Sequence, residues 1–337
     1  MRATDPLTIF KYRNFSFVWG STTLLAVGTQ MEAVVLGWFI LEVTDSPFMV
    51  GLTWTARMSL NFLALFAGAI ADRVARQRLL AAVEFVMSFL GMAMLLLILI
   101  GILEVWHIFG IIMASGMVRV FQMPSAQALV ADTLPQERIA TGAAFNSVGM
   151  NLGMLIGPLV GGILYKIYGP QGAYIAISVL YFMSGLFSLL IRGINAPVIQ
   201  TRESVLRTMI MGLKYVKGEQ VLWGTLLLAV IIESSGWTFH TSLMPIYAKE
   251  VLGTDSAGLG WLMFAFGIGA LGASLILALV RNRKHVGKSM IIAALVWHTC
   301  IIIVATSQTF YLSMGLLVMI GGAWASTQVF MLSVLLG

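Results

Sequence analysis

The feature that most constrains this chain is a series of ten apolar runs, each near the length of about 20 residues that a helix needs to cross a bilayer. They cover residues 15–41, 48–70, 79–103, 106–130, 139–165, 172–191, 221–246, 256–280, 288–306 and 309–335. Hydrocarbon offers backbone groups no hydrogen-bond partners, so runs of this length cross it as helices. Charged residues form 10% of the chain, against about 25% in soluble domains. We therefore expect an all-α, polytopic membrane protein with ten transmembrane helices.

The basic residues are distributed unequally between the two sides of the predicted membrane. With the N-terminus inside, 16 of the 20 Lys and Arg residues lie in inside segments and two, Lys166 and Lys249, lie outside. This asymmetry predicts a cytoplasmic N-terminus in a cell inner (plasma) membrane. Because the basic residues belong to short loops, we expect no nucleic-acid partner. Met1 to Asn14 precedes an apolar segment without a small-residue cleavage site, which predicts an uncleaved first helix.

The cysteine and histidine content argues against metal or catalytic chemistry. Cys300 is the only cysteine, which excludes an intrachain disulfide and a thiolate zinc cluster. The histidines lie at different predicted depths, and no Ser/His/Asp or metal-ligand spacing occurs; they are His107, His240, His285 and His298. We expect no cofactor, no metal site and no catalytic residues, and hence a protein that is not an enzyme.

An internal repeat with an offset of about 205 residues divides the chain. Lys11-Tyr12 with Trp19-Gly20 recurs as Lys214-Tyr215 with Trp223-Gly224, and Gly51-Leu-Thr-Trp54 recurs as Gly258-Leu-Gly-Trp261. The repeat predicts an N-terminal six-helix half over 1–191 and a second half over 221–337 that holds helices seven to ten. Two helices of an expected twelve are then missing, so we expect a C-terminally truncated chain.

Residues 192–220 are predicted to form a cytoplasmic amphipathic linker, since apolar residues recur in it at helical spacing. It either only joins the two halves or has a regulatory, lipid-sensing role.

A charged hairpin separates the second and third apolar runs. It reads Gly68-Ala-Ile-Ala-Asp72-Arg73-Val-Ala-Arg76-Gln-Arg78. This spacing resembles the signature of the loop between helices 2 and 3 in the major facilitator superfamily of secondary transporters, departing from it at Ala75, where the family usually has Gly. The resemblance implies the major facilitator fold, in which duplicated halves are related by an axis along the membrane normal and the substrate binds between them.

The fourth apolar run adds further gating candidates. Arg119 and Gln122 match the fourth-helix pattern of the superfamily, with Pro124 near where Gly is common. Arg119 is expected within reach of Glu84, either in a structural ion pair or in gating. In the family, a charge network latches the inner gate, and Asp132 would join Asp72, Arg73 and Arg76 in it. The gating set that the resemblance implies is Gly68, Asp72, Arg73, Arg76, Arg119, Gln122 and Asp132.

The fifth run carries a stripe of small residues, Gly153, Gly157, Pro158, Gly161 and Gly162. Glycines four residues apart share one helix face and allow another helix to approach closely, while Pro158 invites a bend. The stripe is either ordinary packing or a hinge against the glycine-rich helix 256–280. It resembles a helix 5 signature found mainly in exporters of the superfamily, which favours export.

Ionisable residues within spans are costly and mark functional sites. Glu32 and Arg57 lie 13 and 12 residues from Asp45 in the turn between their helices, which places both about 18 to 20 Å deep. Equal depth makes them natural partners, and the family commonly has an acid in helix 1 and an arginine in helix 2.

Glu233 has no basic residue at its depth in its own half. Trp237 and His240 share its helix face, which we expect to line the central cavity. Burial of a carboxyl favours its protonated form, so we expect Glu233 to bind and release the coupled proton; alternatively, Glu233 only forms a hydrogen bond to a neighbouring helix.

These patterns together predict a proton-coupled secondary transporter of the major facilitator fold. Its sequence is similar to the branch that includes the enterobactin exporter and macrolide efflux pumps. We expect a monomer in the lipid bilayer that exports an amphipathic small molecule, siderophore or drug-like, by alternating access, and a cavity suited to amphipathic or cationic compounds. The alternatives are proton-driven uptake of a sugar or metabolite and a membrane sensor that does not transport.

Overall fold

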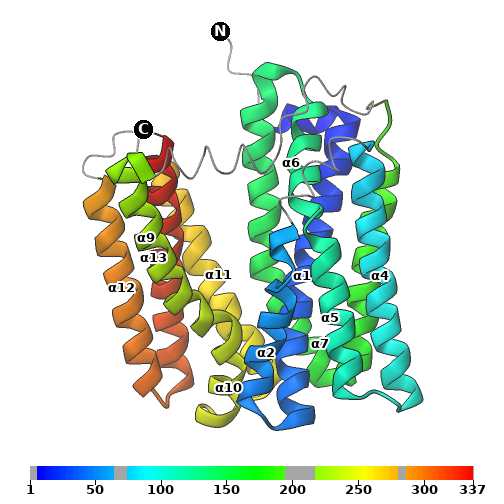
Figure 1. The fold of residues 1–337 in the computed structure, drawn as a ribbon, viewed down its shortest axis with the longest axis vertical. Helices are drawn as coiled ribbons and strands as arrows, with labels where there is room; N and C mark the ends of the chain where they lie inside the picture. Colours follow the sequence, from blue (N-terminus) through cyan, green and yellow to red (C-terminus); the bar gives the residue numbers. More distant parts are fainter. Residues whose placement is uncertain (1–5, 64–73, 194–216, 280–285, 337) are drawn as a thin grey trace. The chain divides into compact units, whose positions relative to one another are not determined.

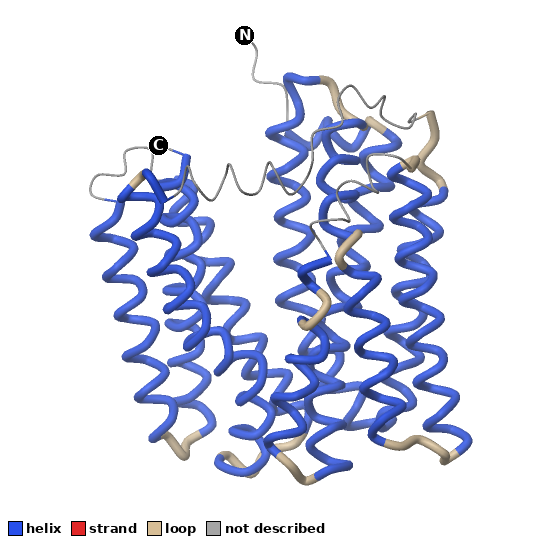
Figure 2. Tube along the Cα trace, in the orientation of Figure 1, coloured by secondary structure: helices blue, strands red, loops and turns tan. Residues whose placement is uncertain are grey.

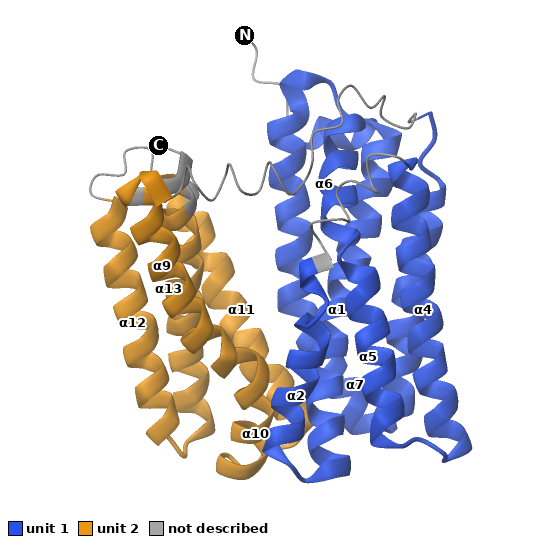
Figure 3. Cartoon of the chain, in the orientation of Figure 1, with its two compact units in different colours: residues 1–202 blue, residues 203–337 orange. Residues whose placement is uncertain are grey.

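The computed structural model describes residues 6–63, 74–193, 217–279 and 286–336 (Figure 1). Within these described residues every regular element is a helix and none is a strand (Figure 2). The chain divides into two compact units, Met1–Arg202 and Glu203–Gly337 (Figure 3). The division falls inside the predicted linker, most of which, residues 194–216, lies outside the described residues.

Unit 1 is built around two long helices that cross the membrane beside each other. The helix α7 packs along α1 and also along α4, while α5 contacts α2 and α4. The helices of this unit are α1 (Arg13–Thr44), α2 (Pro47–Met58), α4 (Arg76–Ile100), α5 (Val105–Arg119), α6 (Gln122–Asp132) and α7 (Ile139–Leu189). The long helices α1, α4 and α7 therefore form the packed core of unit 1, against which α2, α5 and α6 lie.

The element α7 contains two of the predicted spans. Gly169 interrupts it with φ 66° and ψ −171°, in the left-handed half of backbone space that glycine adopts without steric cost. Pro170 follows and lacks the N–H that would continue the first helix. The predicted spans 139–165 and 172–191 therefore meet at this break, as the sequence indicated.

The predicted span 106–130 is broken instead of continuous. The helix α5 ends at Arg119 and α6 begins at Gln122. Pro124 has no N–H to donate to the carbonyl four residues earlier, that of Val120, so one backbone hydrogen bond of a continuous helix cannot form here. Arg119 and Gln122 therefore lie at the edges of a break in the membrane-spanning segment, where backbone geometry departs from the regular helix.

Unit 2 contains the remaining predicted spans. Its elements are α9 (Gln220–Thr238), η4 (Phe239–Leu243), α10 (Met244–Ile246), η5 (Tyr247–Val251), α11 (Ser256–Leu279), α12 (Val286–Thr306) and α13 (Phe310–Leu336). The helix α13 packs against α11 and α12 and also contacts α9. The segments η4 and η5 are π-helical, a wide local helix form that often occurs at functional sites.

Eight segments of the described residues are long and apolar enough to cross a membrane. One of them, Gln136–Leu189, holds the two spans joined at Gly169. The predicted span 48–70 is described only up to residue 63, as α2 and a short 3-10 turn. The eight segments therefore correspond to nine of the ten predicted runs, and the tenth, 48–70, is described only in part. The chain is an all-α, multi-pass membrane protein.

The glycine stripe of α7 packs within its own unit. A Cβ on Gly153 would lie 2.6 Å from the Ala26 carbonyl carbon, and one on Gly157 would lie 2.6 Å from the Val27 carbonyl oxygen, both on α1. Gly161 faces Met31 of the same helix, and Gly162 and Pro158 are also buried. The stripe therefore packs against α1 within unit 1, and a hinge role against helix 256–280 stays a prediction.

Candidate functional site

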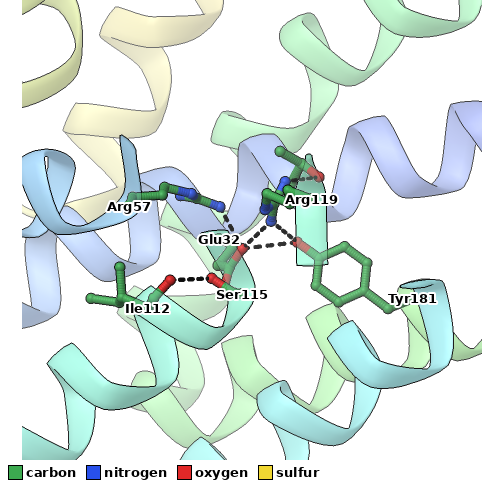
Figure 4. A network of polar contacts seen from close by, with 7 residues as sticks. Glu32, Arg57, Ile112, Ser115, Arg119 and Tyr181 are labelled. Carbon is green, nitrogen blue, oxygen red and sulfur yellow. Dashed lines mark hydrogen bonds and ion pairs between the residues drawn. The ribbon is translucent and has the colours of Figure 1, made fainter. Parts of the chain in front are cut away.

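A buried network of charged side chains connects four helices of unit 1 (Figure 4). Glu32 Oε2, on α1, accepts hydrogen bonds from Arg57 Nη2 at 2.8 Å and from Arg119 Nη2 at 2.6 Å. The Tyr181 hydroxyl lies 2.9 Å from both Glu32 Oε2 and Arg119 Nη2. One carboxylate oxygen thus joins α1, α2, α5 and α7.

Local packing brings the two arginines to the same oxygen. Gly116 lies one turn before Arg119 on α5, and a Cβ there would overlap the carbonyl oxygen of Arg57. The absence of a side chain lets α5 approach the backbone of α2 closely. Arg119 is fixed further by a 2.8 Å hydrogen bond from Nη1 to Thr29 Oγ1 on α1, so its guanidinium spans one turn of that helix.

The network carries more positive than negative charge. Glu32 contributes one carboxylate, whereas Arg57 and Arg119 contribute two guanidinium groups. The residue Arg57 is 4% exposed and Glu32 is 9% exposed, so water screens the pair poorly. Arg119 Nε is buried and has no hydrogen-bond partner in the described part of the chain. An excess buried charge is costly, and it attracts an anionic group to this region.

A cavity of about 200 Å³ with both polar and apolar lining residues lies beside this network in unit 1. Thr29, which binds Arg119, lines it together with Gln122 from the start of α6. The other lining residues come from α1, α6 and α7 and are Thr22, Ala26, Gln30, Met123, Ala126, Gln127, Asn146 and Met150. Amides and hydroxyls alternate with methionines, a lining that suits an amphipathic ligand. Pockets that enclose whole drug-sized ligands hold about 300 to 1,000 Å³, so this cavity accommodates part of such a molecule.

The predicted contact between Arg119 and Glu84 does not form. Arg119 binds Glu32, and Glu84 Oε1 instead contacts the hydroxyls of Ser21 and Ser184 at 2.5 and 2.6 Å. Counted from the turn at Glu104, Arg119 is 15 residues along its helix, or about 22 Å deep, close to the depth assigned to Glu32.

One pair of the predicted gating network is present. Arg76 Nη1, at the start of α4, donates to Asp132 Oδ2, at the end of α6, over 2.7 Å. Gly68, Asp72 and Arg73 lie outside the described residues. The Arg76 to Asp132 ion pair therefore ties α4 to α6, and its role in gating stays a prediction.

Unit 2 holds a second candidate region around Glu233. Gln328 Nε2 of α13 donates to Glu233 Oε1 over 2.7 Å, and Glu233 is half-buried. Trp237 stacks on Trp324 of α13 and also approaches His240, with ring centroids 5.4 and 5.1 Å apart. The shared face predicted for Glu233, Trp237 and His240 thus meets α13.

Two buried nitrogens in this region, His240 Nδ1 and Trp324 Nε1, have no hydrogen-bond partner among the described residues.

Sequence reasoning missed several polar residues that complete these regions: Thr29, Asn146, Tyr181, Trp324 and Gln328. They were overlooked because only charged side chains were compared by depth. The same comparison applied to uncharged polar residues would have proposed them. In the described residues no three His, Cys, Asp or Glu side chains are placed to hold a metal ion.

Comparison with known proteins identifies the class to which this fold and these sites belong. A family of the major facilitator superfamily, described as transmembrane secretion effector, matches residues 4–334. The chain belongs to this family of membrane transporters.

The curated relatives are transporters of the same superfamily. The staphyloferrin A transporter of Staphylococcus aureus is 25% identical over 277 residues, which are 80% of this chain and 68% of the relative. The multidrug resistance protein MdtG of Proteus mirabilis is 24% identical over 251 residues, 72% of this chain and 60% of the relative. An uncharacterized transporter of Bacillus subtilis, YkuC, matches 57% of this chain over 44% of its own length. The chain thus spans between 44% and 68% of the lengths of these relatives.

A solved structure shows the same fold. A bacterial homologue of the human lysosomal transporter Spinster, in an inward-facing and unoccupied conformation, superposes with a TM-score of 0.71. It is 13% identical in sequence, and the match covers 95% of this chain and 75% of the homologue. The architecture is therefore the major facilitator fold.

Proposed function

We propose that this protein is a proton-coupled secondary transporter that exports an amphipathic small molecule by alternating access. Two observations support export: the glycine–proline stripe around Gly157 and Pro158, and relatives named for drug resistance. The proposed protein is a monomer in the inner (plasma) membrane. Its N-terminus is proposed to be cytoplasmic, because basic residues are concentrated on one predicted side of the membrane. Nothing in this proposal requires a nucleic acid or a cofactor.

The observation that carries this proposal is the buried charge network beside the cavity that Thr29 and Gln122 line. Ionisable groups persist within a membrane protein where they serve a ligand or ion pathway. Arg119 contacts Thr29, whose side chain also lines the cavity that Gln122 borders. A ligand group in the cavity that contacts Thr29 is therefore separated from Arg119 by that one side chain.

The charge balance of the network supports a substrate with an anionic group. Two guanidinium groups share one carboxylate in unit 1, so a ligand carboxylate or phosphate would supply the missing negative charge. The sequence favoured amphipathic or cationic compounds; the charge balance keeps the amphipathic class and favours an anionic group in place of a cationic one. A siderophore or an acidic drug fits, and staphyloferrin A is a reasonable first probe because a relative is named for it.

Glu233 is the proposed proton carrier of unit 2. Its hydrogen-bond partner is the uncharged Gln328, and it forms no ion pair within the described residues. A carboxyl in such surroundings gains or loses a proton without breaking an ion pair, which suits a coupling site.

Inverted membrane vesicles provide the test of this function. With an acidic interior, we expect accumulation of the anionic probes carboxyfluorescein and staphyloferrin A, exceeding that of the cationic dye ethidium, and loss of the accumulation after addition of a proton ionophore. Vesicles that lack the protein are the control. Accumulation only in right-side-out vesicles would show uptake, and absence of flux for every probe in both orientations would favour the sensor; either result contradicts the proposal.

A further inference from the structure

Glu84, near the middle of α4, is enclosed by hydroxyl groups from two other helices. The Ser21 and Ser184 hydroxyl oxygens lie 2.5 and 2.6 Å from Glu84 Oε1, and Ser188 Oγ lies 2.8 Å from Ser21 Oγ. All of these residues have 0% exposure. Ser21 belongs to α1, whereas Ser184 and Ser188 belong to α7. The cluster therefore lies where α1, α4 and α7 meet.

The carboxyl has no cationic partner in the described residues. Of the cations on the helices around it, Arg119 of α5 is paired with Glu32 and Arg76 of α4 is paired with Asp132 of α6, and no ion pair joins any described cation to Glu84. Glu84 Oε2 is buried without any hydrogen-bond partner in the described residues. An ionised Glu84 would therefore place an uncompensated charge within protein, which is strongly unfavourable.

Counting protons in the cluster leads to the same conclusion. Ser184 Oγ lies 2.6 Å from Glu84 Oε1 and also 2.9 Å from the carbonyl oxygen of Ser21. Together with the Ser21 to Glu84 and Ser21 to Ser188 contacts, four short contacts share three hydroxyl protons. A serine has one proton to donate, and a protonated carboxyl has one as well. A proton on Glu84 supplies the missing donor.

We propose that Glu84, Ser21, Ser184 and Ser188 form a buried proton-binding site that couples proton movement to transport. The coupling step rests on the proposed function, while proton binding does not. Thr22, the residue after Ser21, lines the cavity beside the charge network. A displacement of α1 that opens the cavity also separates Ser21 from Glu84. Water then reaches the carboxyl, its O–H bond breaks, and the proton passes to water and leaves a carboxylate.

A proton fits this cluster better than a metal ion does. Metal ions such as Ca²⁺ need several oxygens around an open centre, at about 2.3 to 2.6 Å from the ion. Here the oxygens contact one another directly at 2.5 to 2.9 Å, and no centre remains between them. The site is therefore assigned to a proton.

Infrared spectroscopy of the purified protein tests proton binding without any substrate. In the Glu233→Gln background, which removes the other carboxyl proposed to carry a proton, we expect a carbonyl-stretching band of a buried protonated carboxyl at neutral pH, and loss of that band on adding Glu84→Gln. Glu137, exposed on the short helix before α7, gives the matched control, since Glu137→Gln should keep the band. Ser184→Ala should retain the band but shift its frequency. Persistence of the band in Glu84→Gln overturns the assignment. If Glu84→Gln does not fold, Ser184→Ala decides, and an unshifted band in that variant overturns the assignment.

The melting temperature gives a second measurement. Because the folded state holds a proton that an unfolded glutamate loses above about pH 4.3, the wild type should lose stability as pH rises from there until the folded carboxyl ionises, and Glu84→Gln should lose less. Equal pH dependence of the two proteins would contradict the site. Stabilisation of the wild type by NaCl over choline chloride, absent in Glu84→Gln, would assign the cluster to Na⁺ and overturn proton binding.

The transport measurement addresses the coupling step. In acid-loaded inverted vesicles, Glu84→Gln should lose the accumulation of carboxyfluorescein that the pH gradient drives, while exchange of carboxyfluorescein at equal pH continues. Full gradient-driven accumulation in Glu84→Gln overturns coupling through this site. If the wild type transports no probe, the export proposal fails, and the infrared and melting results still decide whether Glu84 binds a proton.

Discussion

Glu32 and Arg119 form the shortest contact of the buried charge network, with Oε2 and Nη2 2.6 Å apart across 87 residues of sequence. Arg57 approaches the same oxygen at 2.8 Å. The carboxylate is therefore the centre of the network, and each arginine keeps a counter-charge if the other is removed. Loss of Glu32 should therefore reduce the free energy of unfolding more than loss of either arginine.

Glu32→Gln should destabilise the protein more than Arg57→Gln does. Removing the carboxylate leaves two buried guanidinium groups without a negative partner, a loss of about 3 to 5 kcal/mol. Removing Arg57 leaves Glu32 paired with Arg119, and we expect a loss of about 1.5 to 3 kcal/mol, the value of one hydrogen bond to a charged group. Thermal unfolding in detergent measures both.

The double variant Glu32→Gln with Arg57→Gln extends this comparison. If Arg57 were the only partner, the double change would recover most of the stability. Because Arg119 also binds Glu32, we expect only partial recovery, with a further gain on adding Arg119→Gln. Strictly additive losses would show that the three side chains do not interact.

The sequence predicted Glu32 and Arg57 as partners because both were counted from one turn, at Asp45. It paired Arg119 with Glu84 instead, although Arg119, 15 residues from the turn at Glu104, lies at about the same depth as Glu32. The predicted spans that the structure describes in full are helical, as hydropathy indicated, because the thickness of the bilayer sets the length of a membrane-spanning helix. The break between α5 and α6 was not predicted, although Pro124 signals it. Side-chain pairing depends on helix rotation, which hydropathy does not specify.

Gly157→Ala should destabilise unit 1 although alanine favours helices. The new Cβ would lie 2.6 Å from the Val27 carbonyl oxygen, so α7 and α1 must separate. Overpacking of this kind costs about 1 to 3 kcal/mol. Gly110→Ala on α5 is the control, because nothing lies within 4 Å of a Cβ there. Equal melting temperatures for the two variants would mean that α1 does not pack on this face.

Arg76→Gln and Asp132→Asn should each have little effect on unfolding. Their side chains are 18% and 30% exposed, and pairs near the surface contribute about 0 to 1 kcal/mol. If the pair has the proposed gating role, vesicle transport should fall several-fold more than stability does, and exchanging the two residues should restore part of it. Unchanged transport in both single variants would leave the pair without a role in gating.

Glu233→Gln should separate driven transport from exchange. Glutamine retains an oxygen that accepts the 2.7 Å hydrogen bond from Gln328 but cannot bind and release a proton, so we expect normal folding and equilibrium exchange of carboxyfluorescein with loss of accumulation driven by the pH gradient. The matched control is Gln328→Leu, which removes the hydrogen bond and keeps the carboxyl. Its accumulation should persist, because the titratable group is still present. Gradient-driven accumulation at the wild-type level in Glu233→Gln would remove Glu233 from the coupling mechanism and leave Glu84 as the proton site.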